Sequence, residues 1–206
     1  MTDRAKRIGV FGGAFDPPHN AHLALVQAAL SRLSLDELIV FPTGHAWHKA
    51  RPLSPAADRL AMAQLAFSDS PKVSVDPREM HRPGPSYTID TLSELHAERP
   101  GAELVLLLGG DQAAALPTWH RWRDILKIAI ISVASRDPSA LENADFLPES
   151  TPLDLDEGRF QALQMPAMNL SATEVRRRVA AGLGIAHLVP AGVARYIDQH
   201  HLYLAP

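Results

Sequence analysis

Two glycines and two histidines near the start of the chain form its most informative chemical pattern. Residues 8–22 read Ile-Gly-Val-Phe-Gly-Gly-Ala-Phe-Asp-Pro-Pro-His-Asn-Ala-His. The apolar run predicts a buried strand that stops at Gly12 and Gly13, where a backbone without Cβ atoms lets a ligand approach closely. Helical apolar spacing follows, and the spacing of His19 and His22 puts both imidazoles on one face of the first turn. Imidazole donors, glycine amides and a helix N-terminus in one place are typical of a phosphate site.

Simpler interpretations of this segment stay open. A Gly-Gly pair after a strand can be an ordinary turn, and a histidine pair can lie on a solvated helix face. A zinc site would need three or four ligands, and the sequence has no Cys and no obvious third partner. The segment is not the Rossmann G-x-G-x-x-G pattern, and no P-loop G-K-[ST] occurs in the chain.

A second candidate phosphate site lies in the segment 169–176, which reads Asn-Leu-Ser-Ala-Thr-Glu-Val-Arg. Ser171 with Glu174 three residues later fits a helix capping box, which alone could explain both residues. Thr173 and Arg176 fall on the same face of the predicted helix start. They add a hydroxyl and a guanidinium to the free amides of a positive helix end.

Composition restricts the class of protein. The 206 residues carry a formal net charge of −3, so any phosphate binding must be local rather than a general attraction to nucleic acid or membranes. The absence of Cys excludes disulfides, Fe–S clusters and thiol catalysis, and it suits a reducing cytosol. No apolar run has the length of a membrane span or the form of a signal peptide. We expect a cytoplasmic protein with one domain, 1–206, whose portion from about 170 to 206 is helical; a homo-oligomer stays open.

Apolar runs alternate with helical patterns along the chain. Strands are predicted at 8–11, 37–42, 73–75, 103–108 and 128–133, and helices after His22 and at 56–67, 86–98, 113–116, 119–126, 172–181 and 190–200, with a surface connection at 135–158. Strands that are apolar throughout and separated by helices predict an α/β fold, a doubly wound, mostly parallel sheet with helices on both faces. Ligands on such sheets bind beyond the carboxyl ends of the strands. Gly12-Gly13 and Gly109-Gly110-Asp111 both fall there.

The first segment resembles G-G-x-F-D-P-x-H-x-G-H, the hallmark of nucleotidyltransferases that join a phosphate ester to the AMP part of ATP. It departs from that motif at Ala21, where Gly is usual, and at Ala14, where Thr or Ser is common. The segment 169–176 resembles the I-S-x-T-x-x-R motif of the same family, with Leu170 in place of Ile. The resemblance implies a Rossmann-like nucleotidyltransferase fold.

Between these motifs the chain is similar to the bacterial nicotinate-nucleotide adenylyltransferases. Pro85-Ser86-Tyr87-Thr88 resembles their P-S-Y-T, Gly109-Gly110-Asp111 their G-x-D, Pro117-Thr118-Trp119 their P-T-W, and His48-Lys49 the end of their P-P-H-[KR]. Arg136 matches an arginine after the fifth strand, although Asp137-Pro138-Ser139 replaces the usual Pro-Gly-Tyr. The resemblance spans nearly the whole chain.

The resemblance implies a reaction and a set of roles. ATP and nicotinate mononucleotide would give nicotinate adenine dinucleotide and pyrophosphate, in NAD biosynthesis, with Mg²⁺ on the ATP phosphates and no metal held by the protein. Catalytic roles are implied for His19, His22 and Arg176. ATP contacts are implied for Gly12, Gly13, Phe15, His19, His22, Lys49, Gly109, Asp111, Leu170, Ser171, Thr173 and Arg176. Contacts to nicotinate mononucleotide are implied for Gly13, Ala14, His48, Ser86, Tyr87, Thr88, Trp119 and Arg136.

Alternatives remain at the level of residues and of function. Asp111 could be a helix N-cap instead of a ribose ligand, and Trp119 could pack in the core instead of stacking on a pyridine ring; Trp122 is interpreted as packing. Phosphopantetheine adenylyltransferases share the first motif but not P-S-Y-T and P-T-W together. The remaining alternatives are an adenylyltransferase that uses nicotinamide mononucleotide, and a nucleotide-binding regulatory protein without turnover.

Overall fold

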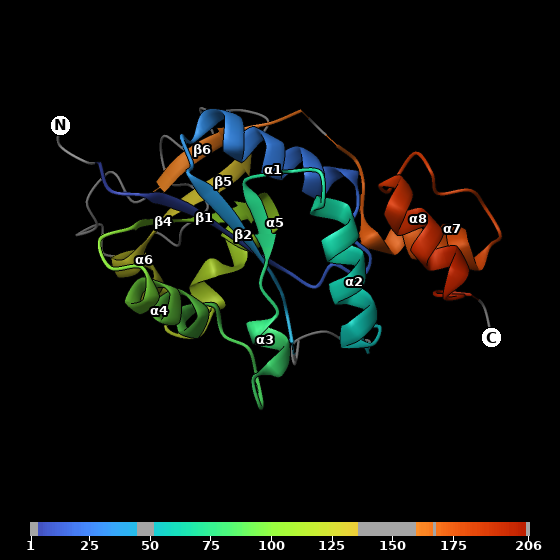
Figure 1. Cartoon of the computed structure of the whole chain (residues 1–206), viewed down its shortest axis with the longest axis horizontal. Helices are drawn as coiled ribbons and strands as arrows, with labels where there is room; N and C mark the ends of the chain where they lie inside the picture. The colour runs from blue at the N-terminus through green and yellow to red at the C-terminus, as the bar shows by residue number, and fades with distance from the viewer. Residues whose placement is uncertain (1–3, 45–51, 136–159, 167, 205–206) are drawn as a thin grey trace.

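The computed structural model describes residues 4–44, 52–135, 160–166 and 168–204. Its centre is a six-stranded parallel sheet in the order β3-β2-β1-β4-β5-β6 (Figure 1). The strands are β1 (Arg7–Gly13), β2 (Glu37–Pro42), β3 (Val73–Val75), β4 (Glu103–Gly109), β5 (Ala129–Ser135) and β6 (Phe160–Gln164). This order confirms the predicted doubly wound sheet and puts the topological switch point between β1 and β4.

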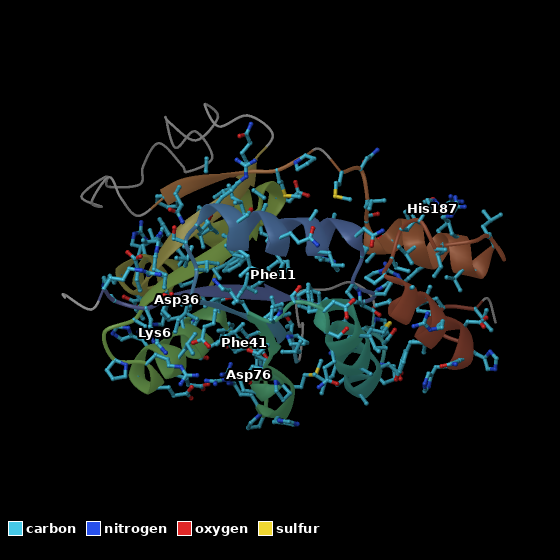
Figure 2. All side chains as sticks on the ribbon, turned by 45° about the horizontal axis from the view of Figure 1, so that its top comes forward. Lys6, Phe11, Asp36, Phe41, Asp76 and His187 are labelled. Atoms are coloured by element: carbon cyan, nitrogen blue, oxygen red, sulfur yellow. The ribbon has the colours of Figure 1, made fainter. Side chains whose placement is uncertain are left out.

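Helices cover both faces of the sheet. They are α1 (Asn20–Arg32), α2 (Ala56–Phe67), α3 (Arg78–His81), α4 (Thr88–Glu98), α5 (Gly110–Ala115), the 3₁₀ helix η1 (Leu116–Thr118), α6 (Trp122–Ile128), α7 (Ala172–Ala180) and α8 (Ala191–Gln199). One core packs α1, α2, α7 and α8 on the sheet, and a second core packs α4, α5 and α6. Phe11 belongs to the first core and Phe41 to the second; both are labelled in Figure 2. Strands buried on two faces explain the continuous apolar runs of the sequence.

Several predicted boundaries were wrong. β1 does not stop before the glycines: Gly12 and Gly13 pair with Phe41 and Pro42 of β2, and the chain turns at Phe15, whose φ is 48°. The helix predicted from Ser86 begins at Thr88, because Tyr87 is its extended N-cap. Likewise, the helices predicted at 113–116 and 119–126 begin at other residues in the structure. α5 begins at Gly110, and α6 begins at Trp122 after Arg121, whose φ is 51°.

The two short elements α3 and β6 were not predicted, since four or five residues give little periodicity. Trp122 lies in the second core, which confirms its interpretation as a packing residue. Within the described residues, no helix has the length and apolar character that a bilayer crossing requires.

Candidate active site

The two histidines of the first segment are stacked at the beginning of α1. Their ring centroids lie 3.8 Å apart with an interplanar angle of 24°, which confirms that the imidazoles share one face. His19 is the N-cap of α1, and its backbone N–H donates to Nδ1 of His22 at 3.0 Å. Because Nδ1 of His22 accepts this bond, the neutral ring carries its proton on Nε2. His22 lines a cavity, so it can offer an Nε2–H donor to a ligand there.

His19 is held neutral by its surroundings. The side chain is 7% exposed, and burial lowers its pKa from 6.5 to about 4. Its Nδ1 is buried and has no hydrogen-bond partner among the described residues. A buried polar atom without a partner is unfavourable, so a hydrogen bond from a ligand to this nitrogen would make binding more favourable.

The low pKa of His19 predicts a loss of stability in mild acid. Between pH 6.5 and 4 the unfolded chain takes up a proton on this histidine and the folded chain does not. The free energy of unfolding therefore falls as pH decreases through this window, by about 2 kcal/mol at pH 5. Urea unfolding at pH 7 and at pH 5 measures this decrease in the free energy of unfolding. Between pH 7 and pH 5, the free energy of unfolding should fall by about 2 kcal/mol less in His19→Asn than in wild type, because all other groups titrate in both proteins. An equal decrease in both proteins would contradict the low pKa of His19.

The second segment forms the start of α7. The backbone N–H of Glu174 donates to the Ser171 hydroxyl at 3.2 Å, which makes Ser171 the N-cap. The Glu174 carboxylate accepts from Arg177 at 2.8 Å. Only the half of the capping box made by the Ser171 hydroxyl is therefore formed. Ser171 thus has the structural role that the sequence allowed, and a ligand contact is an additional prediction.

Arg176 joins the two segments. Its Nη1 donates to the backbone carbonyl of Asp16 at 2.7 Å, and its Nη2 donates to the Thr173 hydroxyl at 3.0 Å. The guanidinium therefore connects α7 to the turn that leads into α1. Two motifs that lie far apart in the sequence meet at one place, with a permanent positive charge between them.

A buried arginine organises the loops behind this place. The Arg59 side chain of α2 is 2% exposed. It donates to the backbone carbonyls of Ala14, Thr43, Gly44 and Ser54, at 2.6–3.2 Å. These bonds fix the chain after β1 against the chain after β2. No sequence pattern indicated this role, because one arginine in a helix usually lies in solvent.

A cavity of about 620 Å³ opens at the carboxyl ends of β1 and β4, where the strand order reverses. The predicted site residues among its lining are Gly12, Gly13, Ala14, His22, Ser86, Tyr87, Thr88, Gly109 and Trp119. A Cβ added at Gly12 or Gly109 would meet no protein atom within 4 Å, so both positions leave open space. The structure therefore brings the first motif and the P-S-Y-T and P-T-W segments to one cavity at the switch point, as expected for this fold.

The other predicted residues that the structure describes are not part of the cavity lining: Phe15, His19, Asp111, Leu170, Ser171, Thr173 and Arg176. The Phe15 ring is buried against Phe11 and His22, so a contact from Phe15 to ATP would have to come from its backbone. Asp111 is exposed within the first turn of α5, whose N-cap is Gly109, so the N-cap interpretation of Asp111 was wrong. His48, Lys49 and Arg136 lie outside the described residues.

Comparison with known proteins agrees with this geometry. Residues 10–178 match the family model for cytidylyltransferase-like proteins. A protein of Albidiferax ferrireducens named "Probable nicotinate-nucleotide adenylyltransferase" is 61% identical over 198 residues, covering 96% of this chain and 98% of that protein. The chain belongs to the nicotinate-nucleotide adenylyltransferase family. A relative of the same name from Methylibium petroleiphilum is 44% identical over 206 residues, covering 98% of this chain and 94% of its own length.

Solved structures share the fold of this adenylyltransferase family member. The nicotinic acid mononucleotide adenylyltransferase of Plasmodium falciparum, solved in complex with NaAD, has a TM-score of 0.74 at 19% sequence identity. The match covers 96% of this chain and 97% of that chain. At this identity the likeness establishes the Rossmann-like fold, which agrees with the fold predicted from the motifs.

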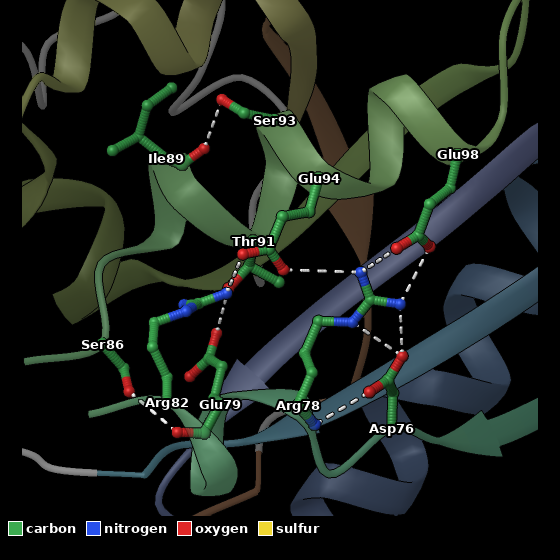
Figure 3. Close-up of polar contacts among 10 residues, drawn as sticks. All are labelled: Asp76, Arg78, Glu79, Arg82, Ser86, Ile89, Thr91, Ser93, Glu94 and Glu98. Atoms are coloured by element: carbon green, nitrogen blue, oxygen red, sulfur yellow. Dashed lines mark hydrogen bonds and ion pairs between the residues drawn. The ribbon is translucent and has the colours of Figure 1, made fainter. Parts of the chain in front are cut away.

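Sequence reasoning missed several residues that line the adenylyltransferase cavity. The rings of His120 and Tyr87 lie 4.3 Å apart at its wall. Glu79 also lines it; burial raises the pKa of this carboxyl, and its Oε1 accepts from the Thr91 hydroxyl at 2.7 Å. Figure 3 shows Thr91 between Glu79 and Arg82. Glu79 falls in a strongly charged segment, which gave it the appearance of a surface residue.

Ala21, where the family motif has glycine, is a further member of the cavity lining. It lies in the first turn of α1, beside His22. If its methyl narrows the phosphate path, Ala21→Gly should lower the KM for ATP by about fivefold, which corresponds to relief of about 1 kcal/mol of crowding. The same change should destabilise the helix by roughly 0.5–1 kcal/mol. An unchanged or higher KM would contradict the crowding and show that the helix start is adapted to alanine.

Nucleotidyltransferases of this kind use a divalent metal together with ATP. Within the described part of the chain, no group of three His, Cys, Asp or Glu side chains is placed to hold a metal ion. Among the residues with described positions there is thus no ready set of protein ligands for the metal. An ion carried on the triphosphate would rely on phosphate oxygens and water instead.

Proposed function

We propose that this protein transfers the AMP part of ATP to nicotinate mononucleotide in NAD biosynthesis and releases pyrophosphate. The observation that carries the proposal is the contact between Arg176 and Asp16. It joins both phosphate motifs beside a cavity lined by Tyr87, Thr88 and Trp119, the segments typical of the nicotinate branch.

The reaction needs alignment and charge stabilisation more than proton transfer. A phosphate oxygen of the mononucleotide attacks the α-phosphorus of ATP, and the bond from that phosphorus to the bridging oxygen of the β-phosphate breaks. A phosphate monoester has its second pKa near 6, so it is already largely ionised at neutral pH and needs no general base. The site must hold two anions in line and stabilise the charge that develops on the transferred and leaving groups.

The residues of the first motif supply donors for that charge. His22 lines the cavity and can offer its Nε2–H there, beside the positive dipole end of α1. The backbone N–H groups of Asn20 and His22 are already used, since they donate to the carbonyls of Leu188 and His19. Arg176 brings a guanidinium charge to the same turn. The guanidinium has no nucleophilic lone pair, and the imidazole of His22 uses its Nδ1 lone pair to accept from the His19 backbone, which suits direct transfer between the two substrates.

The opposite part of the cavity suits the pyridine nucleotide. Trp119 and Tyr87 offer aromatic faces for a pyridine ring. Thr88 begins α4 and lines the cavity, so first-turn N–H groups without an acceptor in the helix would be available to a substituent of that ring. A structure with this fold from Plasmodium falciparum is described as a complex with NaAD, the product of this reaction.

We further propose Mg²⁺ as the divalent ion, carried on the ATP phosphates, and the cytoplasm as the place of the reaction. The chain would act as one catalytic unit, because α7 contributes Arg176 to a site built on the sheet. No step of the reaction is assigned to the metal.

Pyrophosphate release from α-labelled ATP tests the proposal. The purified protein is incubated with nicotinate mononucleotide, nicotinamide mononucleotide or phosphopantetheine, and the labelled product is identified. The expected result is pyrophosphate together with labelled nicotinate adenine dinucleotide, and no label transferred to phosphopantetheine. Nucleotide binding without release for any acceptor would contradict the proposal and favour a regulatory protein.

A further inference from the structure

The segment after α8 reaches the first phosphate motif. His201 and Tyr203 have left-handed backbones, with φ of 51° and 64°, which turn the chain after the helix. The backbone N–H of Leu202 donates to the carbonyl of Ile197 at 3.0 Å and holds this turn on α8. The Tyr203 hydroxyl then donates to Oδ1 of Asp16 at 2.7 Å. Left-handed backbone is unfavourable for such side chains, so its use here indicates that the packing of this segment stabilises it.

Asp16 is a buried carboxylate at the centre of the motif, 3% exposed and three residues before His19. Its Oδ2 accepts from the backbone N–H of Ser54 at 3.3 Å, and its own carbonyl accepts from Arg176 at 2.7 Å. A buried carboxylate needs such donors, since the charge is costly away from water. Burial and the Asp16 charge raise the pKa of Tyr203, so its hydroxyl stays protonated as a donor.

We propose that Tyr203 is a positioning residue for adenylyl transfer. Its hydroxyl holds the Asp16 carboxylate, and through it the turn that presents His19 and His22 to the phosphates. The inference rests on the proposed function, and it assigns a role in that reaction to a segment that carries none of the family motifs. Tyr203 acts through Asp16 and need not touch either substrate.

The variant Tyr203→Phe keeps the ring that packs on the core and removes only the hydroxyl. We expect kcat to fall by about tenfold, because displacement of donors that act in the transition state slows the reaction more than it weakens substrate binding. The KM values for ATP and nicotinate mononucleotide should stay within about threefold of wild type.

Tyr196→Phe is the matched control. The Tyr196 hydroxyl donates to Oδ1 of Asp58 at 2.9 Å and ties α8 to α2, but Asp58 lies outside the phosphate motifs. Both variants lose one tyrosine-to-carboxylate hydrogen bond from the same part of the fold. The melting temperature should fall more in Tyr203→Phe, because the Asp16 carboxylate is buried and Asp58 is not, and Tyr196→Phe should keep the wild-type kcat.

Imidazole NMR separates positioning from general destabilisation. The C–H resonances of His19 and His22, assigned with His19→Asn and His22→Ala, should shift in Tyr203→Phe and not in Tyr196→Phe. A kcat of Tyr203→Phe within twofold of wild type, an equal loss of kcat in the control, or unmoved resonances would each overturn the inference. A wild-type protein that transfers no AMP would contradict the proposed function instead, and the NMR comparison would still test the positioning.

Discussion

His22→Ala should lower kcat at least a hundredfold while the protein stays folded. His22 lines the cavity, and its ring carries the proton on Nε2 because Nδ1 already accepts from the His19 backbone. Charge on the phosphate oxygens grows in the transition state, so this donor contributes more there than in the substrate complex. Loss of one such donor typically costs on the order of 3 kcal/mol of transition-state stabilisation, which corresponds to the expected decrease.

His96→Ala is the control for this measurement, since His96 is an exposed histidine in the last turn of α4, outside the cavity lining. It should keep the wild-type kcat. Steady-state kinetics for both variants, together with their melting temperatures, separate catalysis from folding. Retention by His22→Ala of more than about a third of the wild-type kcat would contradict the catalytic role and favour a histidine on a solvated surface.

The parts of the fold that the sequence predicts well are those with long apolar patterns. β2 and α2 have the bounds that were predicted, because each is a continuous apolar or helical run between clear turn residues. The bounds of β3 were also predicted, although its three residues, Val-Ser-Val, form no long pattern. Prediction failed where one backbone conformation decides the boundary. The left-handed Phe15 and Arg121 set the turn after β1 and the start of α6, and neither residue type signals that conformation.

The candidate site also has features that the sequence predicts and features that it does not. That His19 and His22 share one face follows from local spacing and was predicted, and capping by Ser171 was one of the two interpretations that its spacing left open. Contacts between distant segments could not be predicted from spacing. The carbonyl bonds of Arg59 and the Tyr203–Asp16 bond depend on how loops and α8 pack around the sheet. Sequence motifs thus identify the ligand groups, while the residues that hold them in place become visible only in the folded chain.

The choice of acceptor depends on the start of α4. Because the helix begins at Thr88, with Tyr87 as an extended N-cap, its first-turn amides and positive dipole end lie beside the cavity. The Asp90 N–H already donates to the Tyr87 carbonyl at 3.1 Å, so a carboxylate on the pyridine ring can accept only from the first-turn N–H groups of Thr88 and Ile89. A carboxamide must turn its NH₂ group toward one of them or leave it unpaired. Each charge-assisted hydrogen bond gained by the acid is worth roughly 1.5–3 kcal/mol.

The most direct test of the account is therefore the ratio of kcat/KM for nicotinate and nicotinamide mononucleotides, measured side by side with saturating ATP. The enzyme should prefer nicotinate mononucleotide by about tenfold to a hundredfold, which corresponds to one charge-assisted hydrogen bond. Equal efficiency, or a preference for the amide, would contradict it, because the start of α4 would then not distinguish the two substituents.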